Sequence, residues 1–138
     1  MNAETGWYYL HTNGDLIFKR YEPEMEPGGF VRRVWPIDTS NRADAWRVVL
    51  EAAGLGASIE RVRELAAKWK ITPEDLPEYM AHTGVAEVNA ERKAGMVRLA
   101  EEVWRVDLDA LFDIIGATPK GGQPDLDRIR ALPLLGTA

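Results

Sequence analysis

Histidines most often carry acid–base or metal chemistry at neutral pH, and this chain has only two, His11 and His82. His11 falls within an aromatic run, and His82 falls near the expected end of a helix. A His-x-x-Glu-His motif is absent, and neither histidine has a carboxylate four residues further along one helix face. We therefore interpret both histidines as structural residues.

Carboxylates gather in the second half of the chain, at Glu101, Glu102, Asp107, Asp109 and Asp113. Asp109 and Asp113 are spaced to share one helix face and could hold a hard cation between them. The sequence supplies no further convergent oxygen ligands, and a solvated acidic face explains the same pattern. We assign no metal site here.

Two other patterns that could support catalysis are also weak. Gly116 to Gly122 is rich in glycine, but its Lys120 precedes the second glycine of the pattern and no strand leads into it, unlike a phosphate-binding loop. Ser40 and Ser58 are the only serines, and both stand where helix caps belong. With no cysteine, thiolate chemistry and cysteine zinc sites are excluded. We expect no catalytic residue and no cofactor, and hence not an enzyme.

The length and charge of the chain limit the kinds of protein that it could be. The 138 residues fit one domain, residues 1–138, and the net charge of −5 lies entirely in the part after Lys70. An acidic helical half disfavours wrapping nucleic acid, which needs Lys and Arg against phosphates. No stretch reads as a signal peptide or a membrane span, so we expect a cytoplasmic protein with no membrane contact.

The clearest structural signal is a β-hairpin at the start. Apolar-aromatic runs at 7–11 and 16–20 flank Asn13-Gly14, a pair that suits a two-residue type I′ turn. That turn predicts two sets of cross-strand partners. One face carries Trp7 with Arg20, Tyr9 with Phe18, and His11 with Leu16; the other carries Tyr8 with Lys19, and Leu10 with Ile17.

The rest of the chain predicts one more strand followed by helices. Phe30 to Ile37 is rich in β-forming residues, and its Pro36 restricts it to a sheet edge or a strand end. From Asp38 onward the apolar spacing becomes helical. We expect an α+β fold in which an N-terminal three-stranded antiparallel sheet, about 6–37, packs against a C-terminal set of four to five helices, about 41–132.

Caps and stops delimit the expected helices. Asp38, Ser40 or Asn41 can cap the first, which ends at Gly54-Leu55-Gly56. Ser58 caps the second, and Thr72-Pro73 starts a short third. The stretch 86–115 is either one helix or two, with Asp107 capping the second. A brief helix follows near 125–132.

Every strand carries apolar or aromatic residues on both faces, which leaves two alternatives. Either helices cover both faces, or one face is open to solvent or to a partner. An open face would combine aromatic and cationic side chains of the kind that are enriched at protein–protein hot spots and that also stack on unpaired bases. The candidate partner-binding residues are Trp7, Tyr8, Tyr9, Lys19, Arg20, Arg32 and Arg33.

Residues 6–57 resemble a group of small bacteriophage- and prophage-encoded proteins of uncharacterised function, and the likeness extends more loosely to Trp69. The matching segments are Trp7-Tyr8-Tyr9-Leu10-His11-Thr12-Asn13-Gly14-Asp15-Leu16-Ile17, Trp35-Pro36-Ile37-Asp38-Thr39-Ser40-Asn41-Arg42, Ala45-Trp46 and Leu50-Glu51-Ala52. The resemblance implies a phage or prophage origin and a cytoplasmic life in an infected bacterium. It implies no catalytic residues.

Together these observations predict a non-enzymatic interaction protein that binds a host or phage protein and so modulates or inhibits a host complex. The alternative is a nucleic-acid-binding accessory protein that uses an aromatic and basic sheet face. An exposed aromatic face could also pair with a second copy of the chain.

Overall fold

A computed structural model describes residues 5–20, 30–83, 90–117 and 125–134, and the side chains of 81–83 lie outside that description. The strands come first in the chain: β1 (Thr5–His11), β2 (Leu16–Lys19) and β3 (Val31–Asp38). The helices follow as α1 (Arg42–Gly54), α2 (Ile59–Lys68), the 3₁₀ turn η1 (Pro73–Asp75), α3 (Leu76–Thr83), α4 (Ala90–Arg98), the π-helical turn η3 (Leu99–Trp104), α5 (Leu108–Gly116) and α6 (Leu126–Arg130). The α+β prediction is confirmed.

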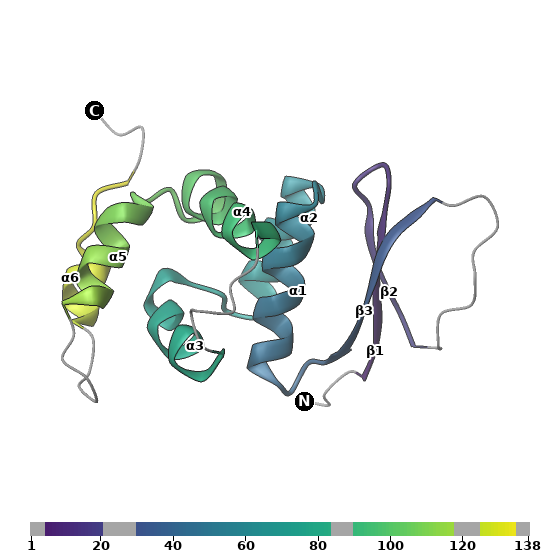
Figure 1. Ribbon diagram of the computed structural model, residues 1–138, viewed down its shortest axis with the longest axis horizontal. Helices are drawn as coiled ribbons and strands as arrows, with labels where there is room; N and C mark the ends of the chain where they lie inside the picture. The colour runs from purple at the N-terminus through teal and green to yellow at the C-terminus, as the bar shows by residue number, and fades with distance from the viewer. Residues whose placement is uncertain (1–4, 21–29, 84–89, 118–124, 135–138) are drawn as a thin grey trace.

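The strands form one antiparallel sheet with the order β2-β1-β3. β3 therefore lies at an edge, as Pro36 predicts, because proline cannot donate a hydrogen bond to a second neighbouring strand. Within the described residues, the helices lie on one side of this sheet, with α5 and α6 farthest from it (Figure 1).

The predicted hairpin register is wrong by one residue. The observed partners are Trp7 with Lys19, Tyr8 with Phe18, Tyr9 with Ile17, and Leu10 with Leu16. Because side chains alternate between faces, this shift moves Phe18 to the face of Tyr8 and moves Ile17 to the face of Tyr9.

The turn explains the shift. The N–H of Gly14 donates to the carbonyl of His11 at 3.0 Å, and the N–H of His11 donates to the carbonyl of Asp15 at 2.8 Å. Gly14 has φ +97°, whereas Asn13 is not among the positive-φ residues. This is a three-residue loop with a glycine bulge rather than a two-residue I′ turn. The extra loop residue shifts the pairing by one position.

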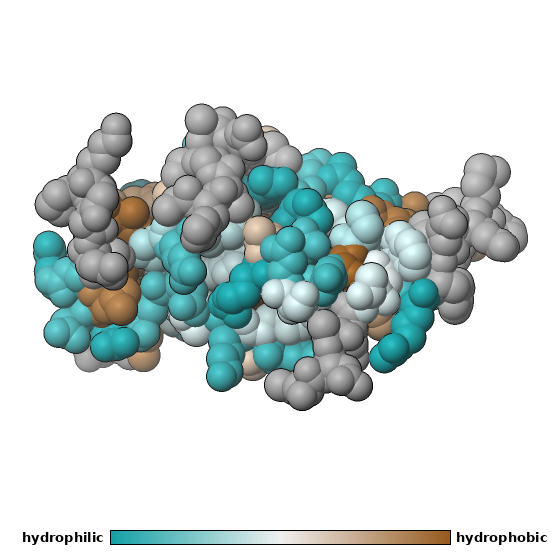
Figure 2. Space-filling view, turned by 90° about the horizontal axis from the view of Figure 1, so that it is seen from below, coloured by the Kyte–Doolittle hydropathy of each residue, from teal (hydrophilic) through white to brown (hydrophobic). Residues whose placement is uncertain are grey.

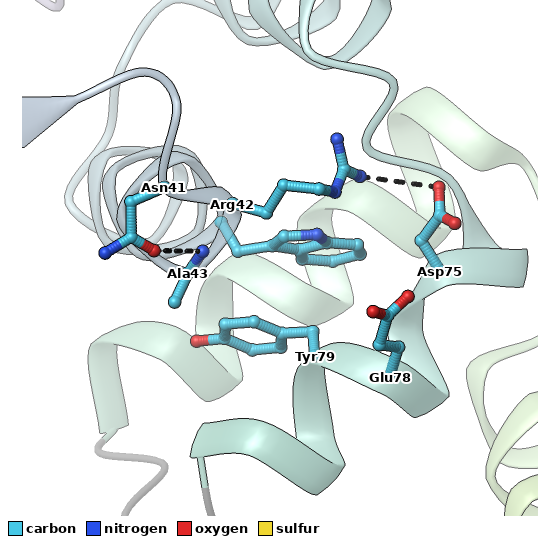
Figure 3. A pocket seen from close by; sticks show the side chains of 7 residues that line it. Asn41, Arg42, Ala43, Asp75, Glu78 and Tyr79 are labelled. Atoms are coloured by element: carbon cyan, nitrogen blue, oxygen red, sulfur yellow. Dashed lines mark hydrogen bonds and ion pairs between the residues drawn. The ribbon is translucent and has the colours of Figure 1, made fainter.

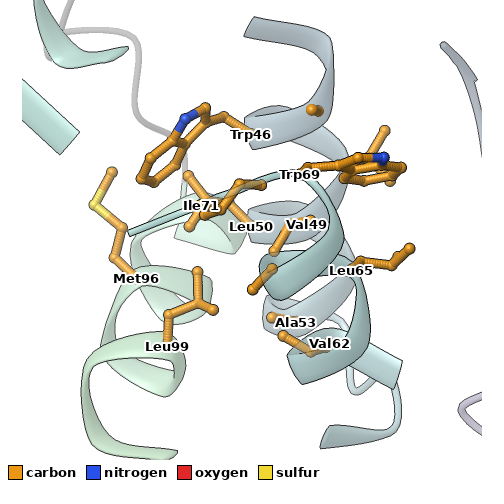
Figure 4. Packing of buried hydrophobic residues seen from close by; sticks show 14 of the residues in the cluster. Trp46, Val49, Leu50, Ala53, Val62, Leu65, Trp69, Ile71, Met96 and Leu99 are labelled. Carbon is orange, nitrogen blue, oxygen red and sulfur yellow. The ribbon is translucent and has the colours of Figure 1, made fainter. Parts of the chain in front are cut away.

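The core joins the inner face of the sheet to the helices. Tyr8 and Leu10 of β1 and Trp35 of β3 are buried in the same hydrophobic cluster as α1 and α2. Tyr8 contacts Trp69 at the end of α2 edge to face, with ring centroids 5.5 Å apart. Figure 4 shows the helical part of this cluster, in which side chains from α1, α2 and the α4–η3 segment meet. Burying each large apolar side chain stabilises the fold by about 1.5–3 kcal/mol.

Most helix boundaries follow the predicted caps. The side chain of Asn41 accepts a hydrogen bond from the N–H of Ala43 at the start of α1. Asp125, which the sequence did not single out as a cap, accepts from the N–H of Arg128 at the start of α6. Ser58 occupies the cap position of α2 but makes no capping hydrogen bond, and its hydroxyl donates to Glu60.

The stretch 86–115, for which the sequence allowed one helix or two, is interrupted at Asp107, so a separate helix begins there. After η3 the chain turns at Arg105, whose φ of 60° and ψ of 43° are left-handed. The carboxylate of Asp107 then accepts from the N–H groups of Asp109 and Ala110 and starts α5. None of the helices in the described ranges has both the length and the apolar character needed to cross a bilayer.

Candidate functional site

The side of the sheet that faces away from the helices is the main candidate surface. We call it the outer face and define it by Trp7, Tyr9, Ile17, Lys19, Val34 and Pro36. The pairing of β1 with β2 and with β3 places these side chains together, because directly opposed residues point to the same side. The neighbouring positions Tyr8 and Leu10 point the other way, into the helices.

The outer face combines a buried centre with exposed apolar neighbours. Tyr9 is 1% exposed, although it does not belong to the cluster beneath the helices. Ile17, its partner on β2, is 42% exposed, and Pro36 on β3 is also exposed. Trp7 and Val34 are half-buried. Of the two alternatives weighed from the sequence, the first, helices over both faces, does not describe this sheet, since none of the helices in the described residues lies over the outer face (Figure 1).

Lys19 is the cation on the outer face. Its Nζ lies 4.5 Å from the centroid of the Tyr9 ring, within range of a cation–π contact. Arg20, the next residue, points to the opposite side, where its guanidinium lies 6.0 Å from the Phe18 ring. Because side chains alternate along the strand, Lys19 and Arg20, both predicted partner-binding residues, lie on opposite sides of the sheet.

The other predicted partner-binding residues are divided between three environments. Tyr8 is buried beneath the sheet, with its ring centroid 5.3 Å from that of Phe18. Arg32 is exposed beside the irregular pairing between β1 and β3. Arg33 points toward the helices and is held in ion pairs there. The structure therefore brings Trp7, Tyr9 and Lys19 together and places the remaining candidates elsewhere.

The ion pairs of Arg33 belong to a network centred on the buried Glu51. Glu51 of α1 accepts hydrogen bonds from Arg33 at 3.3 Å, from the indole of Trp35 at 3.3 Å and from Arg92 of α4 at 3.0 Å. Arg33 also donates to both carboxylate oxygens of Glu91, one of them at 2.8 Å. These contacts lock the sheet, α1 and α4 together, so they are structural.

Electrostatics in this network favour the charged forms. The Arg33 hydrogen bond holds the pKa of Glu91 below its usual range, and burial opposes that effect. The same hydrogen bond raises the pKa of Arg33. Both shifts follow from the attraction between opposite charges at close range.

The remaining sequence candidates stay apart from one another. Ser40 donates its hydroxyl to Asp38 at 2.6 Å, and Asp109 and Asp113 lie on α5. In the described residues, no group of three or more side chains of the His, Cys, Asp and Glu types could hold a metal ion. Most of the glycine-rich segment 116–122 and the side chain of His82 lie outside the description.

Sequence analysis missed a pocket between the start of α1 and α3. Arg42 and the stacked rings of Trp46 and Tyr79 line it together with Asp75 and Glu78 (Figure 3). The spacing of Asp75 and Glu78 was a usable signal, because residues three apart share a helix face. Nothing in the sequence, however, indicated that α1 would lie opposite them.

The exposed large apolar residues of the described chain lie near the sheet, on α4 and near α6. In the view from below, apolar residues gather near the sheet and near α5 and α6, while hydrophilic residues dominate between them (Figure 2). The exposed large apolar residues include Ile17 and Phe30 at the sheet end and Leu126 and Leu134 at the other.

No protein-family model, curated protein or solved structure matches the chain. The resemblance to phage- and prophage-encoded proteins stays a prediction.

Proposed function

We propose that this chain is a non-enzymatic protein–protein interaction module of phage or prophage type, and that the outer face is its contact surface. One observation carries the proposal: the helices that the structure describes all lie on one side of the sheet, yet the opposite side bears aromatic and branched apolar residues. When one face of an antiparallel sheet is exposed to solvent, the side chains on that face are usually polar. The proposed setting is the cytoplasm of a bacterial host.

The composition of the outer face favours a protein partner. Trp is enriched at interface hot spots, and the half-buried Trp7 lies on the outer face with the exposed Ile17 and Pro36, while the buried Tyr9 supports them from the centre. Lys19 adds one positive charge to the outer face. A partner with an apolar patch bordered by carboxylates would complement this surface. Binding of that kind could modulate or inhibit a host complex.

Nucleic acid is the less favoured occupant. Binding to unpaired bases needs stacking rings together with several phosphate contacts from one groove. Lys19 and Arg20 point to opposite sides of β2, and Arg33 is neutralised by Glu51 and Glu91. Few cations therefore remain beside Trp7.

A matched pair of charge insertions tests the proposal. Ile17 on the outer face is 42% exposed and Val97 on α4 is 38% exposed, so Ile17→Asp and Val97→Asp perturb similarly accessible apolar positions. The tagged full chain is cross-linked in a bacterial host, and the captured protein is purified and titrated against each variant. We expect Ile17→Asp to weaken binding at least about tenfold and Val97→Asp to leave it unchanged.

Other results would overturn the outer face as the contact surface or would assign it to a different partner. Equal binding by Ile17→Asp and the unaltered chain would overturn the outer face as the contact surface. A dimer in sedimentation velocity that Ile17→Asp dissociates would assign the face to a second copy instead. Binding of a single-stranded oligonucleotide that weakens steeply with salt and is lost in Trp7→Ala would establish the nucleic-acid alternative.

A further inference from the structure

The tip of the hairpin between β1 and β2 carries an asparagine that precedes a glycine. Of the four asparagines in the chain, only Asn13 stands in such a pair. Asparagine is chemically labile, and a following glycine leaves its side-chain amide open to attack by the next backbone nitrogen, because glycine has no Cβ to obstruct the approach. Asn13 is exposed, so water and solvent bases reach it. The residue pair and its position therefore both favour loss of this amide.

The native loop engages both polar atoms of the Asn13 amide. The Oδ1 atom accepts from the N–H of Asp15 at 3.0 Å, and Nδ2 donates to the Oδ2 atom of Asp15 at 3.2 Å. Local hydrogen bonds of this kind are characteristic of asparagine in turns. Both contacts are exposed to solvent, so on their own they hold the amide weakly.

The backbone nitrogen of Gly14 is held more firmly than the side chain of Asn13. Its N–H donates to the carbonyl of His11 at 3.0 Å. Gly14 is also buried, and its carbonyl accepts from the N–H of Ser58 at 2.9 Å, where the connection from α1 reaches α2. A Cβ added to Gly14 would stand 3.3 Å from the carbonyl oxygen of Gly56, so the tip lies directly on that connection. The nitrogen attacks only after it has lost its proton, and a bonded, buried N–H gives up its proton only when the structure opens locally.

We propose that Asn13 is a deamidation site that the native hairpin keeps closed and that becomes reactive when the tip lifts from the helices. A solvent base removes the amide proton of Gly14, and the nitrogen then attacks Cγ of Asn13. The new N–Cγ bond closes a succinimide ring as the Cγ–Nδ2 bond breaks, and Nδ2 leaves as ammonia with a proton from the solvent. Water then opens the ring. Cleavage of the new bond gives aspartate, cleavage of the original peptide bond gives isoaspartate, and no atom is oxidised or reduced.

Both products disturb the tip. Isoaspartate routes the main chain through the Cβ and Cγ atoms of the former Asn13, which adds a backbone atom to the loop between His11 and Asp15. Because loop length sets the register of a hairpin, the longer loop no longer matches the pairing that places Ile17 on the outer face. Aspartate keeps the loop length but puts a carboxylate where Nδ2 now donates to Asp15, and the like charges repel. A tip that has reacted therefore does not return to its native position.

The expected consequence is a limited lifetime for the contact surface. Ile17 lies on the outer face only while the native loop holds β2 in register. A chain whose tip has opened and reacted loses that surface permanently, whereas a partner that binds only the closed form protects Asn13 by reducing the open fraction. This consequence rests on the proposed function, but the reaction at Asn13 does not.

The reaction is measured on the full chain in mildly alkaline buffer, by mass spectrometry of the peptide that contains Asn13. The same chain unfolded in guanidinium chloride is the reference. We expect Asn13 to convert at least about tenfold more slowly in the native chain, since only the locally opened fraction reacts. Asn41 is the internal control: it caps α1 and precedes Arg42, whose side chain obstructs the attack, so it should stay intact in both samples. Equal rates for Asn13 in the two samples would overturn the protection by the loop, and an intact Asn13 in the unfolded chain would overturn the site.

A matched pair of variants tests whether opening of the tip controls the reaction. The Nε atom of Arg61 donates to the carbonyl of Leu16 at 2.9 Å, which ties the start of β2 to α2, and Nη1 of Arg61 pairs with Glu64. Arg61→Met removes both contacts, whereas Glu64→Gln removes only the charge pair. We expect Asn13 to convert about threefold faster or more in Arg61→Met and at an unchanged rate in Glu64→Gln. An unchanged rate in Arg61→Met would overturn control by local opening.

The state of the hairpin after the reaction is tested separately. The isoaspartate form is prepared from the unfolded sample by refolding and chromatography, and hydrogen exchange of the His11 and Gly14 amides is compared with that of the fresh chain. We expect at least about tenfold faster exchange in the isoaspartate form, whereas Asn13→Ser, which has no amide to lose, keeps native protection after the same treatment. Native exchange in the isoaspartate form would overturn the lasting change at the tip. None of these measurements involves a partner, so their outcome is independent of the test of the outer face by Ile17→Asp.

Discussion

Gly54 of α1 lies directly against Gly95 of α4, since a Cβ atom added to Gly54 would stand 3.2 Å from the backbone nitrogen of Gly95. The contact is reciprocal along the two helices. A Cβ on Gly95 would come within 1.9 Å of the carbonyl oxygen of Leu50, and a Cβ on Gly54 within 2.0 Å of that of Glu91. The two helices thus cross with their backbones in contact, which only glycine allows here.

We expect Gly95→Ala to destabilise the fold by about 3 kcal/mol or more, because the added methyl group meets backbone atoms that cannot rotate away. Gly116→Ala is the matched control. A Cβ on Gly116, the last residue of α5, has no heavy atom within 4 Å. We expect the control to be neutral or stabilising by up to about 1 kcal/mol, since alanine favours helix. Urea unfolding measures both, and equal stability of the two variants would contradict the close crossing.

Glu51 should be the most sensitive charged residue in the described part of the chain. Removing one member of a buried ion pair costs about 3–5 kcal/mol, because the partner charges are left uncompensated. Glu51 is 6% exposed and serves Arg33, Trp35 and Arg92, so we expect Glu51→Ala to fall in that range. Glu64→Ala breaks a pair with Arg61 in which the Glu64 side chain is 64% exposed, and should cost below about 1 kcal/mol. Thermal unfolding at neutral pH distinguishes the two; a similar loss in both variants would rule out a special role for Glu51.

The Arg33–Glu91 pair predicts a particular pH dependence. The pKa of Glu91 is lowered in the fold, chiefly by the Arg33 hydrogen bond, so the unfolded chain binds this proton first as the pH falls. The stabilisation is therefore complete above the ordinary value of about 4.5 and is lost as the pH drops through the lower folded pKa. We expect Glu91→Gln to be less stable at neutral pH and to lose less stability between pH of about 5 and 3 than the unaltered chain. Unfolding free energies across that range measure this, with Glu101→Gln as control; parallel curves for Glu91→Gln and the unaltered chain would contradict it.

Local signals predicted the elements well. Caps at Asn41 and Asp107 and the proline in η1 stand where helices begin, because a helix end must satisfy its own backbone groups with nearby residues. Pro36 predicted either an edge strand or a strand end, and β3 is an edge strand. Each of these signals acts within a few residues of the chain.

Relationships between distant residues were not predictable in the same way. Arg33 looked like a free surface cation until α1 and α4 placed Glu51 and Glu91 beside it. Gly54 was interpreted only as a helix stop, although it also forms the contact with Gly95. The pocket depends on α1 lying opposite α3 across some 30 residues of sequence, roughly three average helices. The packing of the elements determines which of these distant residues become neighbours, and no local sequence pattern indicates that packing.

The hairpin register can be tested directly, because the two possible turns place Ile17 and Phe18 on opposite faces of the sheet. In the structure Phe18 packs beneath the sheet beside Tyr8, whereas Ile17 is 42% exposed on the outer face. We therefore expect Phe18→Ser to destabilise the fold by about 2–4 kcal/mol and Ile17→Ser by below about 1 kcal/mol. A two-residue I′ turn would bury Ile17 with Tyr8 and Leu10 and would reverse this order. Chemical unfolding of the two variants decides between the turns, and cross-strand contacts between the Tyr8 and Phe18 rings in NMR spectra provide an independent check. The order also matters for function, since Ile17 can be available to a partner only if the three-residue loop sets the register.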